Sequence, residues 1–377
     1  MLNYTGIVAY AAITLTSLAL SMSPPRVDSG RVGVECFDMA GDSVLLEVPA
    51  RRVMMYPPFL WDYLTIDEGP TNILSVSPFS TDEIQEGLFR IIYPDVSNIG
   101  RAPTVGRTAI PGDPELVLAA SPDAVFVWAW FDGSLGDLGI PLVRMGRGEG
   151  EHESAVAAPF KIFGQVSGKI ERTKTLIERY RKEMQKVKSL EAQYESRPRA
   201  LYVYRKTQGV LYVARHNSRE DTLLQLAGAE NAAGDKLVVT LGFEEILEMD
   251  PDVMFIAGYD PGDAVDAICS DPALKGLKAV RNRCVYREPS GASRMEGIVE
   301  EPLLLEWMTE VLHPELPVCF RDDFRRTFWE VYGAALNEED LDRVLCLKEN
   351  GDSLGYRRFM NSESTTENKD YYHAKGT

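Results

Sequence analysis

The sequence is short of positive charge and of histidine. Lys and Arg number 40 against 57 Asp and Glu, which gives a formal net charge of −17 at pH 7. A surface of this sign repels phosphate backbones, so the composition argues against a nucleic-acid partner. Only four histidines occur, and none has the spacing of metal ligands. We therefore expect no histidine-based metal site, no protein metal ligands and no bound cofactor.

The cysteines are few and scattered, and they form neither a CxxC motif nor a Cys/His cluster. They are Cys36, Cys269, Cys284, Cys319 and Cys346. The odd count leaves at least one of them unpaired. In an oxidising compartment, Cys269 with Cys284, or Cys319 with Cys346, are the disulfides to consider. The sequence does not decide between these pairs and free thiols.

Known catalytic signatures are absent as well. The chain contains no GxSxG, no HExxH, no P-loop and no GxGxxG after a strand. Residues 146–150 read GRGEG, but this stretch lacks the Lys and the Ser or Thr of a phosphate cradle, so we interpret it as a flexible loop. We assign no catalytic residues and do not expect an enzyme, although one that uses scattered carboxylates stays open.

One long apolar run is present, at the N-terminus. The first 23 residues carry no charged side chain, and Ala19 and Ser21 are small residues suited to a cut after Ser21. This pattern predicts a secretory signal peptide over residues 1–23, and hence export across the inner membrane to the periplasm or the cell surface. An uncleaved anchor is the alternative, because the segment lacks the usual Lys or Arg. No later segment is apolar and long enough to cross a bilayer.

Two stretches share one pattern, and this repeat predicts two similar lobes. DPELVLAASPDAVFV (residues 113–127) and FEEILEMDPDVMFI (residues 243–256) both run from an acid through a helix and Pro-Asp into an apolar strand. The same offset separates Glu115 from Glu244 and Asp123 from Asp252. Continuous apolar runs of this length are typical of buried parallel strands, which indicates an α/β fold.

The stretch between the two modules predicts a long helix. Residues 168–196 are rich in Glu, Lys and Arg, and their apolar residues recur at helical spacing. A helix of about 26 residues spans roughly 39 Å and can connect two lobes as a rigid strut. We therefore divide the chain into an N-terminal lobe (35–160), a linking helix (161–197), a C-terminal lobe (198–347) and a disordered tail (348–377).

These segments together resemble the class III periplasmic substrate-binding proteins of ABC importers for siderophores, haem and cobalamin. Besides the two repeated modules, the segments that carry the resemblance are FDMAGDSVLLEVPARRVM, GVLYVARHNSREDTLLQLAGAENAA, DPALKGLKAVRNRCVY and EPLLLEWMTEVLHPE. The resemblance implies two Rossmann-like lobes joined by a long rigid interdomain helix, with the ligand between them. It also implies that Glu115 and Glu244 dock on the membrane permease, and a carboxylate at a helix start is electrostatically favoured.

Ligands of open α/β sheets bind beyond the C-terminal ends of the strands, and this rule selects loops rather than motifs. Aromatic side chains and arginines in these loops suit an anionic chelate. The ligand-binding candidates are Phe59, Trp61, Arg107, Trp130, Phe131, Tyr204, Arg205, Tyr259 and Arg294. Glu296, Glu300 and Glu301 are interpreted as a solvated face before a helix, with direct metal contact through oxygen as a minor alternative.

The sequence thus predicts an extracytoplasmic binding protein of an ABC transporter. Its expected ligand is a small-molecule metal chelate, such as an iron–siderophore, haem, a corrinoid or another metal complex, and its expected partners are the permease subunits. An extracytoplasmic enzyme, a chelatase-like protein or a sensory protein on the same scaffold is the alternative, because a fold does not fix a function.

Overall fold

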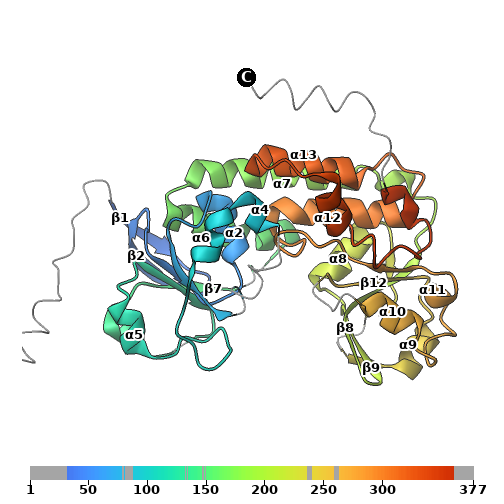
Figure 1. The fold of residues 1–377 in the computed structure, drawn as a ribbon, viewed down its shortest axis with the longest axis horizontal. Coiled ribbons are helices and arrows are strands. Elements are labelled where there is room, and N and C mark those ends of the chain that lie inside the picture. Colours follow the sequence, from blue (N-terminus) through green and yellow to red (C-terminus); the bar gives the residue numbers. More distant parts are fainter. Residues whose placement is uncertain are drawn as a thin grey trace, which may run out of the picture.

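The computed structural model describes residues 32–78, 80, 88–131, 133, 135–146, 148, 150–235, 240–258 and 263–360. Two α/β lobes lie next to each other, and long helices cover one side of both (Figure 1). The predicted α/β fold with two lobes and a long interdomain helix is confirmed. The predicted signal peptide or anchor, residues 1–23, lies outside the described residues.

The N-terminal lobe is built on a parallel sheet of five strands in the order β5-β4-β3-β6-β7. The strands are β3 (Val53–Met55), β4 (Ile73–Val76), β5 (Gly100–Arg101), β6 (Ala124–Trp128) and β7 (Leu142–Met145). The helices of this lobe are α2 (Leu60–Asp67), α4 (Phe89–Ile92) and α5 (Pro114–Ala119). An antiparallel hairpin of β1 (Val32–Phe37) and β2 (Ser43–Val48) precedes the sheet and turns through Gly41, whose φ is 86°.

The C-terminal lobe has a mixed sheet in the order β11-β9-β8-β12-β13, with the short β10 pairing with β8. These strands are β8 (Arg199–Thr207), β9 (Val210–Val213), β10 (Glu230–Asn231), β11 (Thr240–Gly242), β12 (Val253–Ile256) and β13 (Val285–Arg287). Its helices are α8 (Arg219–Leu226), α9 (Phe243–Met249), α10 (Ala264–Cys269) and α11 (Lys278–Arg281). The strands β8, β12 and β13 run parallel, as in the other lobe, while β9 and β11 are antiparallel additions.

The two repeated modules form the same local structure in both lobes. Asp123, which precedes β6, accepts a hydrogen bond from the backbone N–H of Arg51 at 2.8 Å. Asp252, which precedes β12, accepts one from the backbone N–H of Arg199 at 3.0 Å. In each lobe the aspartate therefore fixes where the neighbouring parallel strand begins, which explains why Pro-Asp recurs before both strands.

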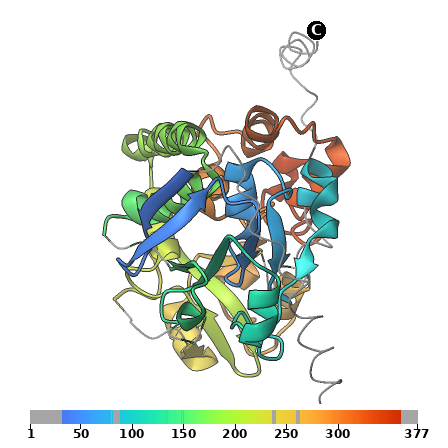
Figure 2. The ribbon, with the colours of Figure 1, turned by 90° about the vertical axis from the view of Figure 1, so that its left-hand side faces the viewer.

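The connection between the lobes is two helices rather than one. The chain forms α6 (His152–Ser167), turns at Gly168 with φ 73°, and continues as α7 (Ile170–Lys188). The predicted boundary at residue 161 thus falls inside α6. Three further helices follow the C-terminal sheet: α12 (Gly297–Leu312), α13 (Phe320–Tyr332) and α14 (Glu338–Val344). Figures 1 and 2 both show α7 and α13 along the top of the lobes.

One hydrophobic core runs through both lobes and the helical layer. It contains Phe126 and Phe163 from the N-terminal side, Tyr180 of α7, and Phe255 and Trp307 from the C-terminal side. Two smaller cores lie within the individual lobes. A continuous core resists deformation because interiors are close-packed, so the helical layer is a rigid support for the two lobes.

The segment after residue 347 was predicted to be a disordered tail, and this prediction is wrong for residues 348–360. The Asn350 amide bonds both the N–H and the carbonyl of Arg287. The Tyr356 side chain is buried, and its hydroxyl donates to the Leu345 carbonyl at 2.7 Å and accepts from Trp307 Nε1 at 3.1 Å. These contacts make the segment part of the C-terminal lobe.

All five cysteines lie in the described part of the chain, and each is a free thiol. Neither of the two disulfides considered from the sequence is therefore formed. Among the described residues, no helix is both long enough and apolar enough to span a bilayer.

Candidate functional site

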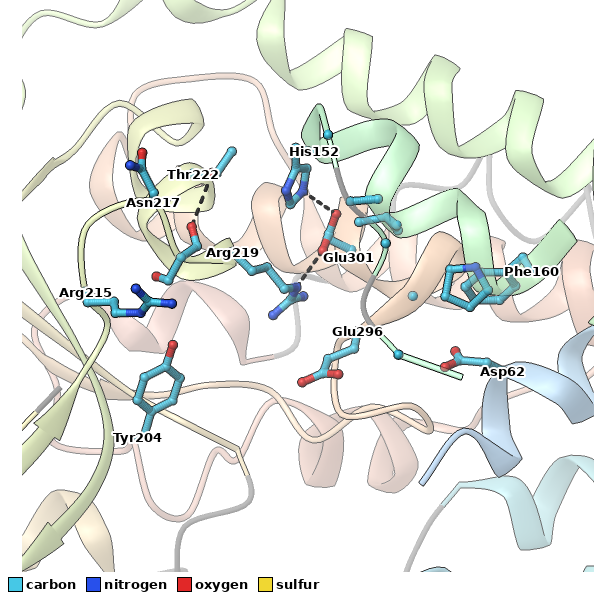
Figure 3. A pocket seen from close by; sticks show the side chains of 18 residues that line it. Asp62, His152, Phe160, Tyr204, Arg215, Asn217, Arg219, Thr222, Glu296 and Glu301 are labelled. Carbon is cyan, nitrogen blue, oxygen red and sulfur yellow. Dashed lines mark hydrogen bonds and ion pairs between the residues drawn. The ribbon is translucent and has the colours of Figure 1, made fainter. Parts of the chain in front are cut away.

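A cavity of about 650 Å³ lies between the two lobes. One wall comes from the N-terminal lobe and consists of Asp62 of α2, the glycine-rich loop after β7 and the start of α6 (Figure 3). The opposite wall consists of Tyr204 of β8, the loop after β9 and the start of α8. Glu296, Gly297 and Glu301 complete the lining from the start of α12. The cavity therefore lies where parallel strands of both lobes end, as expected for an open α/β fold.

The glycine-rich loop is closely packed where the structure describes it. A Cβ atom built on Gly148 would lie 2.3 Å from the Ala155 carbonyl oxygen of α6. A Cβ atom on Gly146 would lie 3.4 Å from the Cβ of Ala129, just after β6. Glycine at 148 is thus required by a close approach to α6, and the described residues of this loop, Gly146, Gly148 and Gly150, bring backbone to the cavity.

A buried ion pair crosses the site from the C-terminal lobe to α12. Arg219 Nε donates to Glu301 Oε2 at 2.5 Å, while His152 Nε2 and the Tyr180 hydroxyl both lie 2.8 Å from Glu301 Oε1. These four residues come from α8, α12, α6 and α7. Burial opposes ionisation of Glu301, but the charge of Arg219 and the hydrogen bond from His152 outweigh it and hold the pKa of Glu301 at about 2.

Every nitrogen of the Arg219 guanidinium group already has a partner within the protein. Its NH2 group donates to the Met295 carbonyl at 2.6 Å, and its NH1 group lies 3.4 Å from Glu220 Oε1. Burial disfavours the charged form of Arg219, but the nearby carboxylates, with Glu301 first among them, raise its pKa further above the ordinary value. We conclude that Arg219 is a structural link between the lobe and α12.

The loop before α12 is held by a buried carboxylate. Glu300 accepts hydrogen bonds from the N–H groups of Ala292, Ser293 and Met295 and from the Ser293 hydroxyl, at 2.6–3.0 Å. Burial raises the pKa of Glu300, and these hydrogen bonds act in the opposite direction. Arg294 and Met295 have positive φ values of 57° and 55°, a conformation that costs non-glycine residues energy. Glu300 thus fixes a strained turn beside the cavity.

Two tyrosines on β8 link the cavity wall to a buried acidic layer. Tyr204 lines the cavity and its hydroxyl donates to Glu220, while the Tyr202 hydroxyl donates to Glu288. Burial raises the pKa of Glu288 to about 8, against the opposing effects of Tyr202 and Arg219. The C-terminal wall therefore has acidic groups directly behind its aromatic surface.

The interpretation of Glu296, Glu300 and Glu301 as a solvated face is wrong. Glu300 and Glu301 are fully buried, and Glu296 lines the cavity. Acidic residues at the start of a helix are equally typical of an exposed helix end, so the sequence pattern did not reveal their burial. Only the tertiary arrangement supplies the partners, such as Arg219 and Tyr180, that make burial of these charges possible.

Of the ligand-binding residues predicted from sequence, Tyr204 lines the cavity. Trp61 is only 5% exposed and belongs to the core, and Phe59 packs against Trp128 and Phe163 at centroid distances of 5.9 and 6.2 Å. Trp130 is 64% exposed, stacks on Trp128 at 6.4 Å and is not among the residues that line the cavity. The remaining predicted residues lie off the described cavity lining or outside the described part of the chain.

Four of these remaining residues are described but do not line the cavity, namely Phe131, Arg107, Arg205 and Arg294. Arg205 lies over the Tyr212 ring at 4.8 Å. Arg107 and Arg294 are exposed. Tyr259 lies outside the described residues. The arginines that line the described cavity are Arg215 and Arg219, which were not among the predicted ones.

Asp62, His152 and Arg219 line the cavity but were not predicted as site residues. Arg215 lies in a loop that the strand-end rule selects, so its loop was predictable. One local signal places Arg219 at a helix start: Ser218 caps α8 by accepting a hydrogen bond from the Asp221 N–H. Asp62 has no distinctive local signal, since it lies in the first turn of α2, where an acid is favoured at any helix start.

The cavity contains carboxylates, but among the described residues no group of three His, Cys, Asp or Glu side chains is arranged to hold a metal ion. The wall offers instead separate polar groups, namely Asp62, Glu296, Arg215 and the Tyr204 ring. Such a wall can position a polar molecule of moderate size through several contacts.

Comparison with known families decides what kind of protein has this cavity. A family model described as periplasmic binding protein matches residues 94–292, which is more than half of the chain. The chain belongs to the periplasmic binding protein family. Membership makes it a solute-binding protein and not an enzyme, which agrees with the absence of catalytic motifs.

Solved periplasmic binding proteins share this fold over nearly their whole length. A periplasmic solute binding protein from Veillonella parvula has a TM-score of 0.73 at 23% identity, covering 85% of this chain and 98% of that one. The molybdate periplasmic binding protein MolA of a Haemophilus influenzae ABC transporter has a TM-score of 0.67 at 18% identity, covering 81% and 99%. Helicobacter pylori CeuE, in a Ni-His complex, has a TM-score of 0.64 at 15% identity, and the match covers 83% of this chain and 99% of that one.

These identities are low enough that they establish the shared fold alone. No curated protein sequence matches this chain significantly. The ligand of this periplasmic binding protein has therefore to be argued from its own cavity.

The two acids predicted to dock on a permease are exposed in this periplasmic binding protein. Glu115 lies in the first turn of α5, which Asp113 caps, and Glu244 lies in the first turn of α9. In Figure 1, α5 and α9 lie at the lower ends of the two lobes, on the side opposite α7 and α13. Both acids thus belong to one side of the molecule.

Proposed function

We propose that this periplasmic binding protein is the extracytoplasmic binding subunit of an ABC importer that captures a small metal complex. The observation that carries the proposal is the cavity of about 650 Å³ between the two lobes, with polar groups on both walls. A cavity of this size suits a ligand larger than a bare ion. The sequence pattern at residues 1–23 supports export to the outer side of the inner membrane.

A complexed metal fits the cavity better than a naked ion does. Within the described residues, the carboxylates and the single histidine at the cavity are not grouped as metal ligands. His152 and Glu301 bind each other, so neither is available. A metal that enters this cavity would therefore keep its own chelating ligands, which the wall would recognise.

Solved relatives support this class of ligand. One is bound to molybdate, one is described with Ni(II) bound, and a third is a heme binding protein with a TM-score of 0.56 at 18% identity, covering 77% of this chain and 93% of its own. We infer the same broad class here, a metal-containing small molecule, from the shared fold together with the polar cavity.

We further propose that Tyr204 and Arg215 contact the ligand from the C-terminal wall. Tyr204 presents a ring at the cavity while its hydroxyl is engaged by Glu220. Arg215 is exposed, and its guanidinium offers several donors to an anionic or polar group. Trp130 follows Ala129, which lies beside Gly146 of the cavity lining, and is proposed as an outer contact and as a natural fluorescence reporter.

Delivery is proposed to use Glu115 and Glu244 as the contacts with the permease. Both are exposed, both begin a helix, and α5 and α9 lie on the same side of the molecule (Figure 1). Carboxylates on each lobe can pair with basic pockets of a partner and fix its orientation.

The test is a binding screen with the protein starting at Met22, followed by Trp fluorescence and calorimetry. The panel holds ferric siderophores, haem, cobalamin, and nickel and cobalt complexes. We expect saturable one-to-one binding of one class at sub-micromolar concentration. The variant Arg215→Gln should weaken it, whereas Arg205→Gln, which removes an arginine away from the cavity, should not. No response to any member of the panel would contradict the proposal.

A further inference from the structure

Two carboxylates of the cavity lack the partners that the neighbouring acids have. Glu301 is bound by Arg219, His152 and Tyr180, and Glu300 by the turn before α12. Asp62 and Glu296 also line the cavity, yet among the described residues their carboxylates form no hydrogen bond or ion pair. The acids available to a ligand are therefore these two.

Asp62 and Glu296 lie close together on one side of the cavity. A Cβ atom built on Gly297, the residue after Glu296, would lie 2.5 Å from Asp62 Oδ1. The absence of a side chain at position 297 thus lets Asp62 approach this turn closely. In Figure 3, the Asp62 side chain extends from α2 toward Glu296, and Arg215 lies across the cavity from both. The pair forms an acidic wall that faces the ligand space.

Among the described residues, no cation forms an ion pair or a hydrogen bond with either carboxylate of this acidic wall. Arg219 and Arg294 interact with Glu296 only through their charge, and Arg219 already donates to Glu301 and to the Met295 carbonyl. Burial raises the pKa of Asp62 well above its ordinary value, and the charges of Glu296 and Glu300 raise it further, against a smaller opposing effect of Arg219. A partly desolvated carboxyl group beside other acids is stabilised in its charged form by an added cation.

We propose that the cargo carries a cationic amine, or an equivalent cluster of N–H donors, that binds Asp62 and Glu296. This inference rests on the proposed function and narrows it from metal complexes in general to complexes with a positively charged arm. The rest of the cargo then faces Tyr204 and Arg215 on the opposite wall. A cationic cargo can form charge-assisted hydrogen bonds to both carboxylates. A neutral analogue is at a clear disadvantage, because it leaves both acids in the cavity without a partner.

The experiment compares two probes that differ only in this charge. Ferrioxamine B carries a free terminal ammonium group, and its N-acetylated form presents the same iron chelate without the charge. Binding of both to the full mature protein is measured by calorimetry. We expect ferrioxamine B to bind roughly tenfold or more tightly than the acetylated complex. Asp62→Asn and Glu296→Gln should each reduce this preference, and the double variant should remove it.

Asp137→Asn is the matched control, because it removes an exposed acid of the same lobe outside the cavity and should leave the preference unchanged. Thermal unfolding checks that each variant is folded, and the comparison of the two probes on the unaltered protein needs no variant. A ferric tris-catecholate complex, which is anionic, serves as the third probe.

The possible results separate the inference from the proposed function. Tighter binding of ferrioxamine B that depends on Asp62 and Glu296 supports both. Equal binding of the two ferrioxamines, or preferential binding of the anionic catecholate, overturns the cationic cargo but leaves a metal-complex binder. Failure of all three probes overturns the inference, and the wider screen of siderophores, haem, cobalamin and metal complexes then decides the proposed function by itself.

Discussion

Arg219 of α8 and Glu301 of α12 form a buried ion pair, with Nε and Oε2 2.5 Å apart, at the boundary between the C-terminal lobe and the helical layer. Only 11% of the arginine side chain and 1% of the glutamate side chain are exposed. His152 and Tyr180 complete the hydrogen bonding of the glutamate from α6 and α7. The pair therefore joins the wall of the cavity to the elements that connect the lobes.

Breaking this pair should destabilise the protein strongly. Glu301→Gln leaves the Arg219 charge buried without its main partner, and removal of one member of a buried pair typically costs about 3–5 kcal/mol. Glu153→Gln is the control, because it breaks the Glu153–Arg181 pair at 2.5 Å whose two side chains are about half exposed. That exposed pair should contribute less than about 1 kcal/mol. Urea unfolding of both variants measures the difference, and equal losses would contradict the structural role of Arg219–Glu301.

Stability should fall as the pH rises toward the alkaline range, because of Glu288. Burial raises the folded-state pKa of Glu288 to about 8, whereas the unfolded chain has the ordinary value near 4.5. Between these values the folded state binds the proton and the unfolded state does not, so raising the pH favours unfolding. The effect is on the order of 4 kcal/mol between about pH 5 and about pH 8.5, since one pKa unit corresponds to ~1.4 kcal/mol.

Urea unfolding across this pH range checks the prediction with Glu288→Gln. The variant cannot titrate, but its amide oxygen can still accept from Tyr202. We expect a shallower loss of stability than in the unaltered protein, with the remainder due to Glu306 and Glu310, whose pKa values burial raises to about 8 and about 7. An unchanged slope would show that Glu288 titrates normally.

Replacing Glu115 and Glu244 together by Ala should abolish uptake while leaving ligand affinity intact. Both side chains are exposed and far along the chain from the residues that line the cavity, so the change removes only the proposed contact with the permease. Uptake of a labelled ligand in cells and calorimetry of the purified protein provide the two readouts. Glu248→Ala removes an exposed acid from the same helix as Glu244 and should have no effect. Normal uptake by the double variant would refute the docking role.

Gly297→Ala should damage the cavity, whereas Gly333→Ala should not. Both glycines have positive φ, 74° and 65°, so an alanine at either position pays a backbone cost of about 1 kcal/mol. The added methyl group at 297 would also lie 2.5 Å from Asp62 Oδ1 and 3.0 Å from the Phe160 ring, while at 333 it meets no atom within 4 Å. We expect a larger loss of stability and weaker ligand binding only for Gly297→Ala. Equal thermal unfolding and equal affinity of the two variants would contradict the close approach of Asp62.

The repeated module shows what a single sequence can predict well. The apolar strands and the Pro-Asp before them depend on local patterns, and the structure gives both aspartates the same hydrogen bond to the neighbouring strand. Such contacts recur because parallel strands pack in the same way in both lobes. The lobes and a long helical connection were therefore predictable from order and spacing.

The cavity was predicted less well, and two neighbouring residues of α2 show why. Trp61 was predicted to contact ligand but is buried in the core, while Asp62 was not predicted and lines the cavity. Successive residues of a helix point about 100° apart, so the rotation of α2 against α6 and the sheet decides which of the two faces the ligand. That rotation depends on packing partners distant in sequence.

The sequence by itself therefore determined the α/β lobes and their repeat, because apolar periodicity and turn residues act locally, while the family was indicated by the resemblance of its segments. Only the tertiary structure decided that Glu300 and Glu301 are buried while Asp62 and Glu296 line the cavity. The physical reason is that the burial of a charge depends on whether a partner lies beside it. Arg219 and His152, which provide that partnership for Glu301, reach it from other helices and from positions far away in the chain.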